Sequence, residues 1–153
     1  MQPGFRTFAE VIAFAAEREE AARQFYLELA RQTNDTFMKQ IFMDFAHEEE
    51  KHRETLENLE AEGLERIFAN IIKPVNDLAL AENAPKVSPA VDLDFKDALL
   101  LAMKREDKSH QLYSMLAENS DDHAVSLLFI GLAKEEAHHK LRIERAYKAL
   151  YGD

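Results

Sequence analysis

Residues 48–52 read EEEKH, a stretch in which Glu49 and His52 stand three residues apart. On a helix this spacing places both side chains on one face, where they can bind the same metal ion. A single such pair arises easily by chance in a chain this rich in Glu. A second copy strengthens the interpretation, because residues 135–139 read EEAHH and give Glu136 and His139 the same spacing. The two matching pairs point to a helical fold built from two similar halves.

The two pairs belong to a longer internal repeat. Residues of the same type recur at a constant offset of 87 positions along the chain, in six matches: Glu19 and Glu106, Tyr26 and Tyr113, Phe42 and Phe129, Ala46 and Ala133, Glu49 and Glu136, and His52 and His139. Six matches at one offset do not arise readily by chance. They predict pseudo-twofold symmetry, with one pair of helices in each half.

Apolar residues recur at alternating spacings of three and four, the pattern of helices that pack into a bundle. These apolar seams run through residues 5–29, 38–59, 95–116 and 125–150. Turn and helix-capping residues separate the seams within each half, namely Asn34 and Asp35 in the first and Asp121 and Asp122 in the second. Such short turns predict that each pair of helices forms an antiparallel hairpin.

We expect one domain over residues 1–153, an all-α, four-helix bundle of two antiparallel hairpins joined by a long crossover. Hairpin one covers residues 5–72, with a short amphipathic piece at 64–72, and hairpin two covers residues 94–150, with Asp94 as its first cap. The crossover, residues 73–93, contains three of the four prolines. About 20 extended residues reach roughly 65 Å, more than the roughly 40 Å of a bundle helix. A disordered linker between two domains is the alternative.

Polar residues interrupt each seam at its middle. They are Glu19, Glu49, His52, Glu106, Ser109, Glu136 and His139. Glu19 and Glu49 lie at similar distances from the first turn, and their counterparts bear the same relation to the second, so the six Glu and His side chains should converge. No Lys or Arg occupies the seam beside them, so buried carboxylates require cations. Four carboxylates match two divalent ions, and the mixed carboxylate and imidazole set suits iron or manganese.

The chain resembles the rubrerythrin branch of the ferritin-like proteins. The motifs that carry the resemblance are EEAARQFY (19–26) with EEKH (49–52), and EDKSHQLY (106–113) with EAHH (136–139). The resemblance implies a ferritin-like bundle with a di-iron centre, in which manganese is the alternative metal. It implies that Glu19, Glu106, His52 and His139 each bind one metal ion and that Glu49 and Glu136 bridge both.

Three further positions carry open interpretations. Tyr26 and Tyr113 either hydrogen-bond to the carboxylates of the centre or pack as core residues. His110, four residues after Glu106, is either a ligand or a flanking residue. Glu135 and His138 form another pair with Glu-x-x-His spacing, but this pair lies off the apolar seam.

Two departures from peroxidase rubrerythrins limit what the resemblance implies. Ser109 stands where those proteins carry a further carboxylate, and the chain has no cysteine to form a rubredoxin domain. We therefore expect a di-Fe(II) centre oxidised by peroxide or dioxygen, with electrons from an external donor such as a separate rubredoxin-type protein. Whether the protein is an enzyme stays open. The alternatives are a bacterioferritin-like ferroxidase for iron storage, a di-manganese catalase, and a metal-binding module without enzymatic activity.

The composition narrows the classes of partner. A net charge of −10 disfavours nucleic acid and favours cations. The longest uncharged stretches are too short to cross a membrane, and the first 16 residues lack the features of a secretory signal. We expect a cytoplasmic protein without a membrane partner. Resemblance to rubrerythrins implies a homodimer, and the crossover would permit hairpins to swap between protomers.

Overall fold

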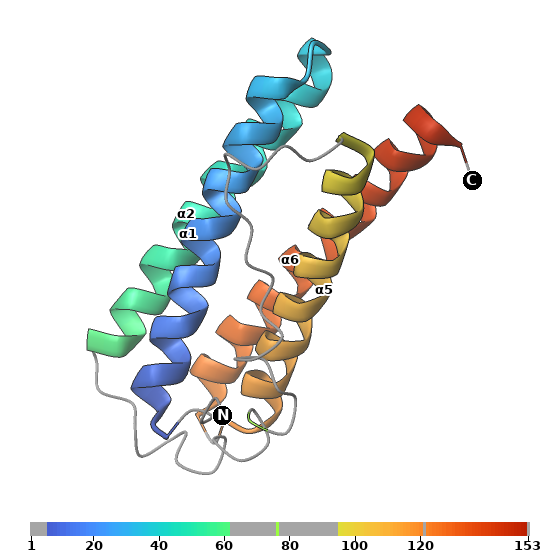
Figure 1. Ribbon diagram of the computed structural model, residues 1–153. Coiled ribbons are helices and arrows are strands. Elements are labelled where there is room, and N and C mark those ends of the chain that lie inside the picture. The colour runs from blue at the N-terminus through green and yellow to red at the C-terminus, as the bar shows by residue number, and fades with distance from the viewer. Residues whose placement is uncertain (1–5, 62–75, 77–94, 121, 153) are drawn as a thin grey trace.

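The computed structural model describes residues 6–61, 76, 95–120 and 122–152. Four long α-helices account for nearly all of these residues: α1 (Phe8–Gln32), α2 (Thr36–Ala61), α5 (Phe95–Glu118) and α6 (His123–Tyr151). Figure 1 shows α1 beside α2 and α5 beside α6, so that two antiparallel hairpins make up the bundle. The predicted all-α, four-helix bundle is confirmed.

Short polar side chains fix where the helices begin. Thr7 caps α1 by accepting a hydrogen bond from the backbone N–H of Glu10 at 3.1 Å. Asp35 accepts one from Met38 N–H at the start of α2, and Asp122 accepts one from Val125 N–H at the start of α6. These contacts satisfy N–H groups that have no partner within the helix. The predicted capping roles of Asp35 and Asp122 are confirmed.

The apolar core is divided into two clusters. One contains the first half of α1, the end of α2, the second half of α5 and the first half of α6, with Phe8, Ile12, Leu116 and Phe129 among its buried residues. The other contains the second half of α1 and the first half of α2, where Phe42 is completely buried. Buried charged residues occupy the middle of each helix between the two clusters. The predicted polar interruption of the seams is therefore a layer across the bundle.

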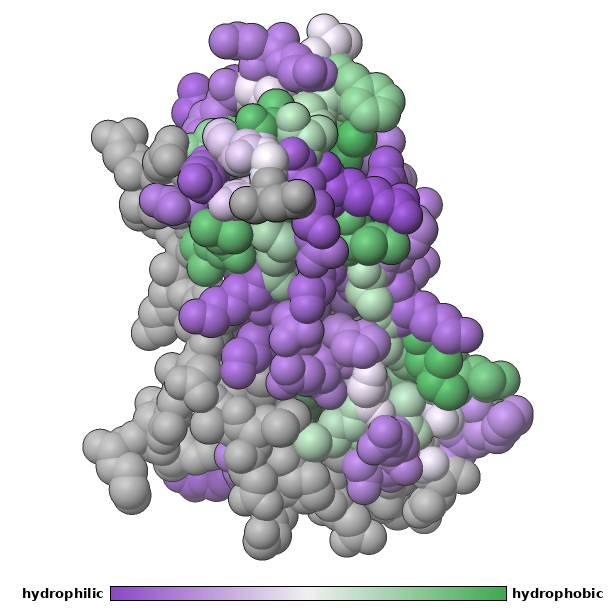
Figure 2. Space-filling view, turned by 90° about the vertical axis from the view of Figure 1, so that its right-hand side faces the viewer, coloured by the Kyte–Doolittle hydropathy of each residue, from purple (hydrophilic) through white to green (hydrophobic). Residues whose placement is uncertain are grey.

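One face of the molecule is mostly hydrophilic (Figure 2). Figure 2 shows one face of the molecule, on which polar and charged side chains predominate and apolar patches are separate. Among the residues that the structure describes, no helix is long and apolar enough to cross a lipid bilayer. The expected amphipathic piece at 64–72, the crossover at 73–93 except Asn76, and the cap at Asp94 lie outside the described residues, as does Asp121. The division into one domain stays a prediction.

Candidate metal centre

The six Glu and His side chains predicted to converge do so in the polar layer. Each is at most 3% exposed, and α1, α2, α5 and α6 all contribute; the six residues are Glu19, Glu49, His52, Glu106, Glu136 and His139. Each helix presents its residues at the point where the apolar seam is interrupted. The helical spacing places Glu49 and His52 on one face of α2, and Glu136 and His139 on one face of α6.

The six residues form two overlapping groups, each suited to one metal ion. One group is Glu19, Glu49, His52 and Glu136, and the other is Glu49, Glu106, Glu136 and His139. Within each group the potential ligand atoms all lie within 4.8 Å of one another. Glu49 and Glu136 belong to both groups, which is the arrangement that a carboxylate bridge between two ions requires. The remaining Glu and His residues each belong to one group.

Donor atoms within these groups lack hydrogen-bond partners among the described residues. They are Glu19 Oε2, Glu49 Oε1, His52 Nδ1, Glu106 Oε2, both carboxylate oxygens of Glu136, and His139 Nδ1. Buried polar atoms are normally hydrogen-bonded, because leaving one unpaired costs about 1–3 kcal/mol. Apart from charge contacts of 3.0–3.7 Å between the two histidines and the carboxylates, these atoms have no partner in the described part of the chain, which fits a metal centre because cations would satisfy them together.

The two imidazole rings are held in the orientation that metal binding needs. His52 Nε2 is hydrogen-bonded to Glu135, and His139 Nε2 is hydrogen-bonded to Glu48. When Nε2–H donates to a carboxylate, Nδ1 is left to face the centre. His52 Nδ1 lies 3.0 Å from Glu136 Oε1. The partner carboxylates are about half-exposed, so they connect the buried rings with the surface.

Sequence reasoning missed the role of these two carboxylates. Glu48 and Glu135 precede Glu49 and Glu136, the two residues shared by both groups, and are themselves related by the repeat offset. This shared offset is the sequence signal that could have identified Glu48 and Glu135 as partners of the histidines. Glu135 does not act in a Glu135–His138 ligand pair, because His138 is exposed and neither residue belongs to the two groups.

The two tyrosines hydrogen-bond across the bundle to carboxylates of the centre. Tyr113 on α5 donates to Glu19 Oε1 on α1 at 2.5 Å, and Tyr26 on α1 donates to Glu106 Oε1 on α5. Burial first, and then the neighbouring carboxylates, raise the pKa of both phenols well above the ordinary value. Tyr26 and Tyr113 therefore remain neutral donors, and both also pack in the apolar clusters.

His110 lies outside both ligand groups. Its Nδ1 is hydrogen-bonded to the backbone carbonyl of Ala133 at 2.9 Å. This contact holds the ring against α6. Of the two interpretations of the sequence, the flanking role agrees with the geometry.

Among the described residues the seam itself holds no Lys or Arg beside the buried carboxylates, but two arginines that start off the seam extend to them. Arg105 is only 5% exposed, and Arg18 also reaches into the polar layer. Arg18 Nη2 donates to the backbone carbonyl of Arg105 at 3.2 Å and to Ser109 Oγ at 3.3 Å. Each arginine directly precedes a glutamate of the centre, off the apolar seam, but its long side chain extends inward. The spacing of apolar residues does not indicate how far a long side chain extends from its helix.

The protonation of the centre follows from burial and from the proximity of its charges. Burial, followed by repulsion from the other carboxylates, raises the pKa of Glu49 and Glu136 well above the ordinary value. Burial opposes the charging of His52, but Glu136 and Glu19 outweigh it and raise its pKa to about 11. The same balance, with Glu106 and Glu48 as partners, raises the pKa of His139 to about 10. Without metal, the centre therefore retains protons at neutral pH.

The fold and the centre together define a ferritin-like bundle with a carboxylate and imidazole cluster that could hold metal. Residues 10–83 match the family model described as Rubrerythrin, which confirms the resemblance predicted from the motifs for that stretch. The whole chain is similar in structure to a Thermotoga maritima protein described as a ferritin-like diiron-carboxylate protein. The TM-score is 0.71, with 18% sequence identity, and the match covers 97% of this chain and 98% of that one. The comparison with curated proteins gave no match.

Proposed function

We propose that this chain is a di-iron carboxylate protein of the rubrerythrin type that reacts with peroxide or dioxygen. The proposed ligands are Glu19, Glu49, His52, Glu106, Glu136 and His139. The observation that carries the proposal is the set of unpaired donor atoms on all six residues, arranged in two groups that share Glu49 and Glu136. The Rubrerythrin match and the fold shared with a protein described as diiron-carboxylate favour iron over manganese.

When bound, two Fe(II) ions would supply the two electrons that reduce one peroxide molecule, with two protons, to two molecules of water. The chain's own residues prepare the site for this reaction. Tyr26 and Tyr113 hold the carboxylates that they contact across the bundle. Glu48 and Glu135 orient the imidazole rings. The apolar clusters on both sides exclude bulk water from the layer.

Recovery of the Fe(II) state requires a reductant from outside the chain. The chain has no cysteine and therefore no thiolate-bound iron of its own. We infer that a separate electron-transfer protein, such as one of the rubredoxin type, supplies these electrons. With no such donor present, the protein should react once per di-iron centre and then stop.

Stopped-flow absorbance tests this proposal directly. The Fe(II)-loaded protein is mixed with hydrogen peroxide or with oxygenated buffer, and Fe(III) formation is followed in the near ultraviolet. We expect oxidation much faster than that of free Fe(II). Glu49→Gln should abolish the fast phase, because it removes a charge shared by both ligand groups, whereas Glu57→Gln, an exposed position on the same helix, should retain it. Oxidation of the wild type no faster than that of free iron would exclude the proposed reaction.

A further inference from the structure

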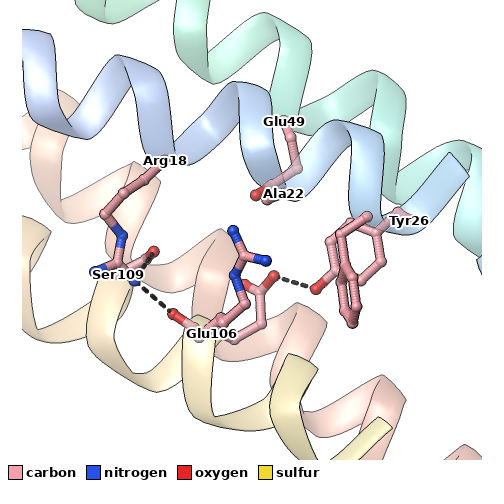
Figure 3. A pocket seen from close by; sticks show the side chains of 8 residues that line it. Arg18, Ala22, Tyr26, Glu49, Glu106 and Ser109 are labelled. Carbon is pink, nitrogen blue, oxygen red and sulfur yellow. Dashed lines mark hydrogen bonds between the residues drawn. The ribbon is translucent and has the colours of Figure 1, made fainter. Parts of the chain in front are cut away.

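A small cavity adjoins the candidate metal centre on the side formed by α1 and α5. Its volume is about 10 Å³, which is about enough room for one water molecule. Its lining combines the guanidinium groups of Arg18 and Arg105 with Ser109 and Ala22, and it opens onto Glu49 and Glu106 of one ligand group. Figure 3 shows Arg18 reaching toward Ser109, with Glu49, Ala22 and Glu106 around the same space.

The two arginines present unused hydrogen-bond donors beside this cavity. Nη1 of Arg18 and Nη1 of Arg105 are buried and have no hydrogen-bond partner among the described residues. The Arg105 guanidinium is fixed 5.3 Å above the ring of Phe25, and Arg18 is anchored on Ser109 and on the Arg105 carbonyl. Buried, fixed and unpaired guanidinium nitrogens are suited to bind an anion.

The charges around the cavity favour an anion when the centre is loaded. Without metal, the carboxylate of Glu106 at the cavity repels an anion. Two divalent ions would cancel the four central carboxylates, and the two guanidinium groups would then leave an excess of positive charge on this side. The carboxylates of Glu48 and Glu135 do not line this cavity. They contact the histidines of the centre from α2 and α6.

Resting on the proposed function, we propose that Arg18, Arg105 and Ser109 form a binding site for one small inorganic anion beside the loaded metal centre. The size of the cavity restricts the ligand to an anion of about the dimensions of water, such as hydroxide or fluoride. The site accepts this anion between α1 and α5, where it lies next to Glu49 and Glu106. The serine at position 109 contributes because its small side chain leaves the cavity open and anchors Arg18.

Fluoride binding to the cobalt(II)-loaded protein tests this site without any redox reaction. Visible absorbance measures cobalt loading, and calorimetry then measures the affinity for fluoride. We expect Arg105→Gln to weaken fluoride binding at least about tenfold, because a hydrogen bond to a charged group is lost. Ala22→Val should weaken it similarly, because its added methyl groups occupy the cavity without changing any charge.

Matched controls separate this site from general effects. Ala21→Val makes the same substitution one position earlier on α1, outside the cavity lining, and Arg23→Gln removes an arginine that pairs with Glu20. Both should bind fluoride like the wild type. Normal cobalt loading with unchanged fluoride affinity in Arg105→Gln and Ala22→Val would refute the anion site. Loss of affinity in Arg105→Gln alone would show that only charge matters and would also refute it. Failure of the wild type to bind cobalt would instead refute the metal centre and the site that depends on it.

Discussion

Metal binding should release protons from the centre, and the number follows from the pKa values of its residues. The pKa values of His52 and His139 are raised to about 11 and about 10, so both rings are protonated at pH 7. Burial, followed by repulsion from the other carboxylates, raises the pKa of Glu49 and Glu136 well above the ordinary value, so metal must displace protons that these groups hold more tightly than ordinary carboxyls do. Every ligand must lose its proton to bind metal. We therefore expect at least two protons, one from each histidine, to be released when two divalent ions bind at pH 7.

The affinity for metal should consequently rise with pH. The two histidines alone give a rise of about a hundredfold in the overall loading constant per pH unit around neutrality, since each released proton contributes a factor of about ten. Calorimetric titration with cobalt(II) in buffers of different ionisation enthalpy measures the number of protons directly. Release of fewer than one proton, or an affinity independent of pH between 6 and 8, would refute this account of the metal-free centre.

Three further outcomes follow. Glu135→Ala should lower metal affinity about 10- to 100-fold, because His52 loses the partner that orients its ring. Calorimetry measures the metal affinity of this variant and of the control Glu57→Ala. Equal affinities of the two variants would contradict the prediction. Tyr113→Phe should lower the free energy of unfolding of the metal-free protein by about 1–3 kcal/mol, because Glu19 Oε1 loses its donor. Urea unfolding measures this change. An unchanged free energy of unfolding would contradict the prediction. The raised histidine pKa values should stabilise the metal-free fold fully below pH 6.5 and progressively less as pH rises toward 10. Thermal unfolding at pH 6 and pH 9 measures this change in stability. Greater stability at pH 9 than at pH 6 would contradict the prediction.

The repeat and the seam interruptions were sufficient to predict the bundle and the clustering of the centre. They succeed because Glu and His are costly to bury in an apolar seam, so each one found there indicates a specific role. The spacing of Glu49 and His52 on α2, and of Glu136 and His139 on α6, then fixes which side chains share a face.

Residues outside the seam were harder to predict, for two physical reasons. Glu48 and Glu135 are about half-exposed, so their positions resemble those of ordinary surface carboxylates. Arg18 and Arg105 start off the seam and enter the layer only through the length of their side chains. A one-dimensional pattern records where a Cβ atom points, but it does not record how far a flexible side chain extends beyond it.

Anomalous diffraction from crystals loaded with Fe(II) under anaerobic conditions tests the central claim most directly. The account predicts two peaks at the iron absorption edge, about 3.5–4 Å apart, with Glu49 and Glu136 between them. Glu19 and His52 should contact one peak, and Glu106 and His139 the other. Iron-loaded crystals with no peak among these six side chains would contradict the account.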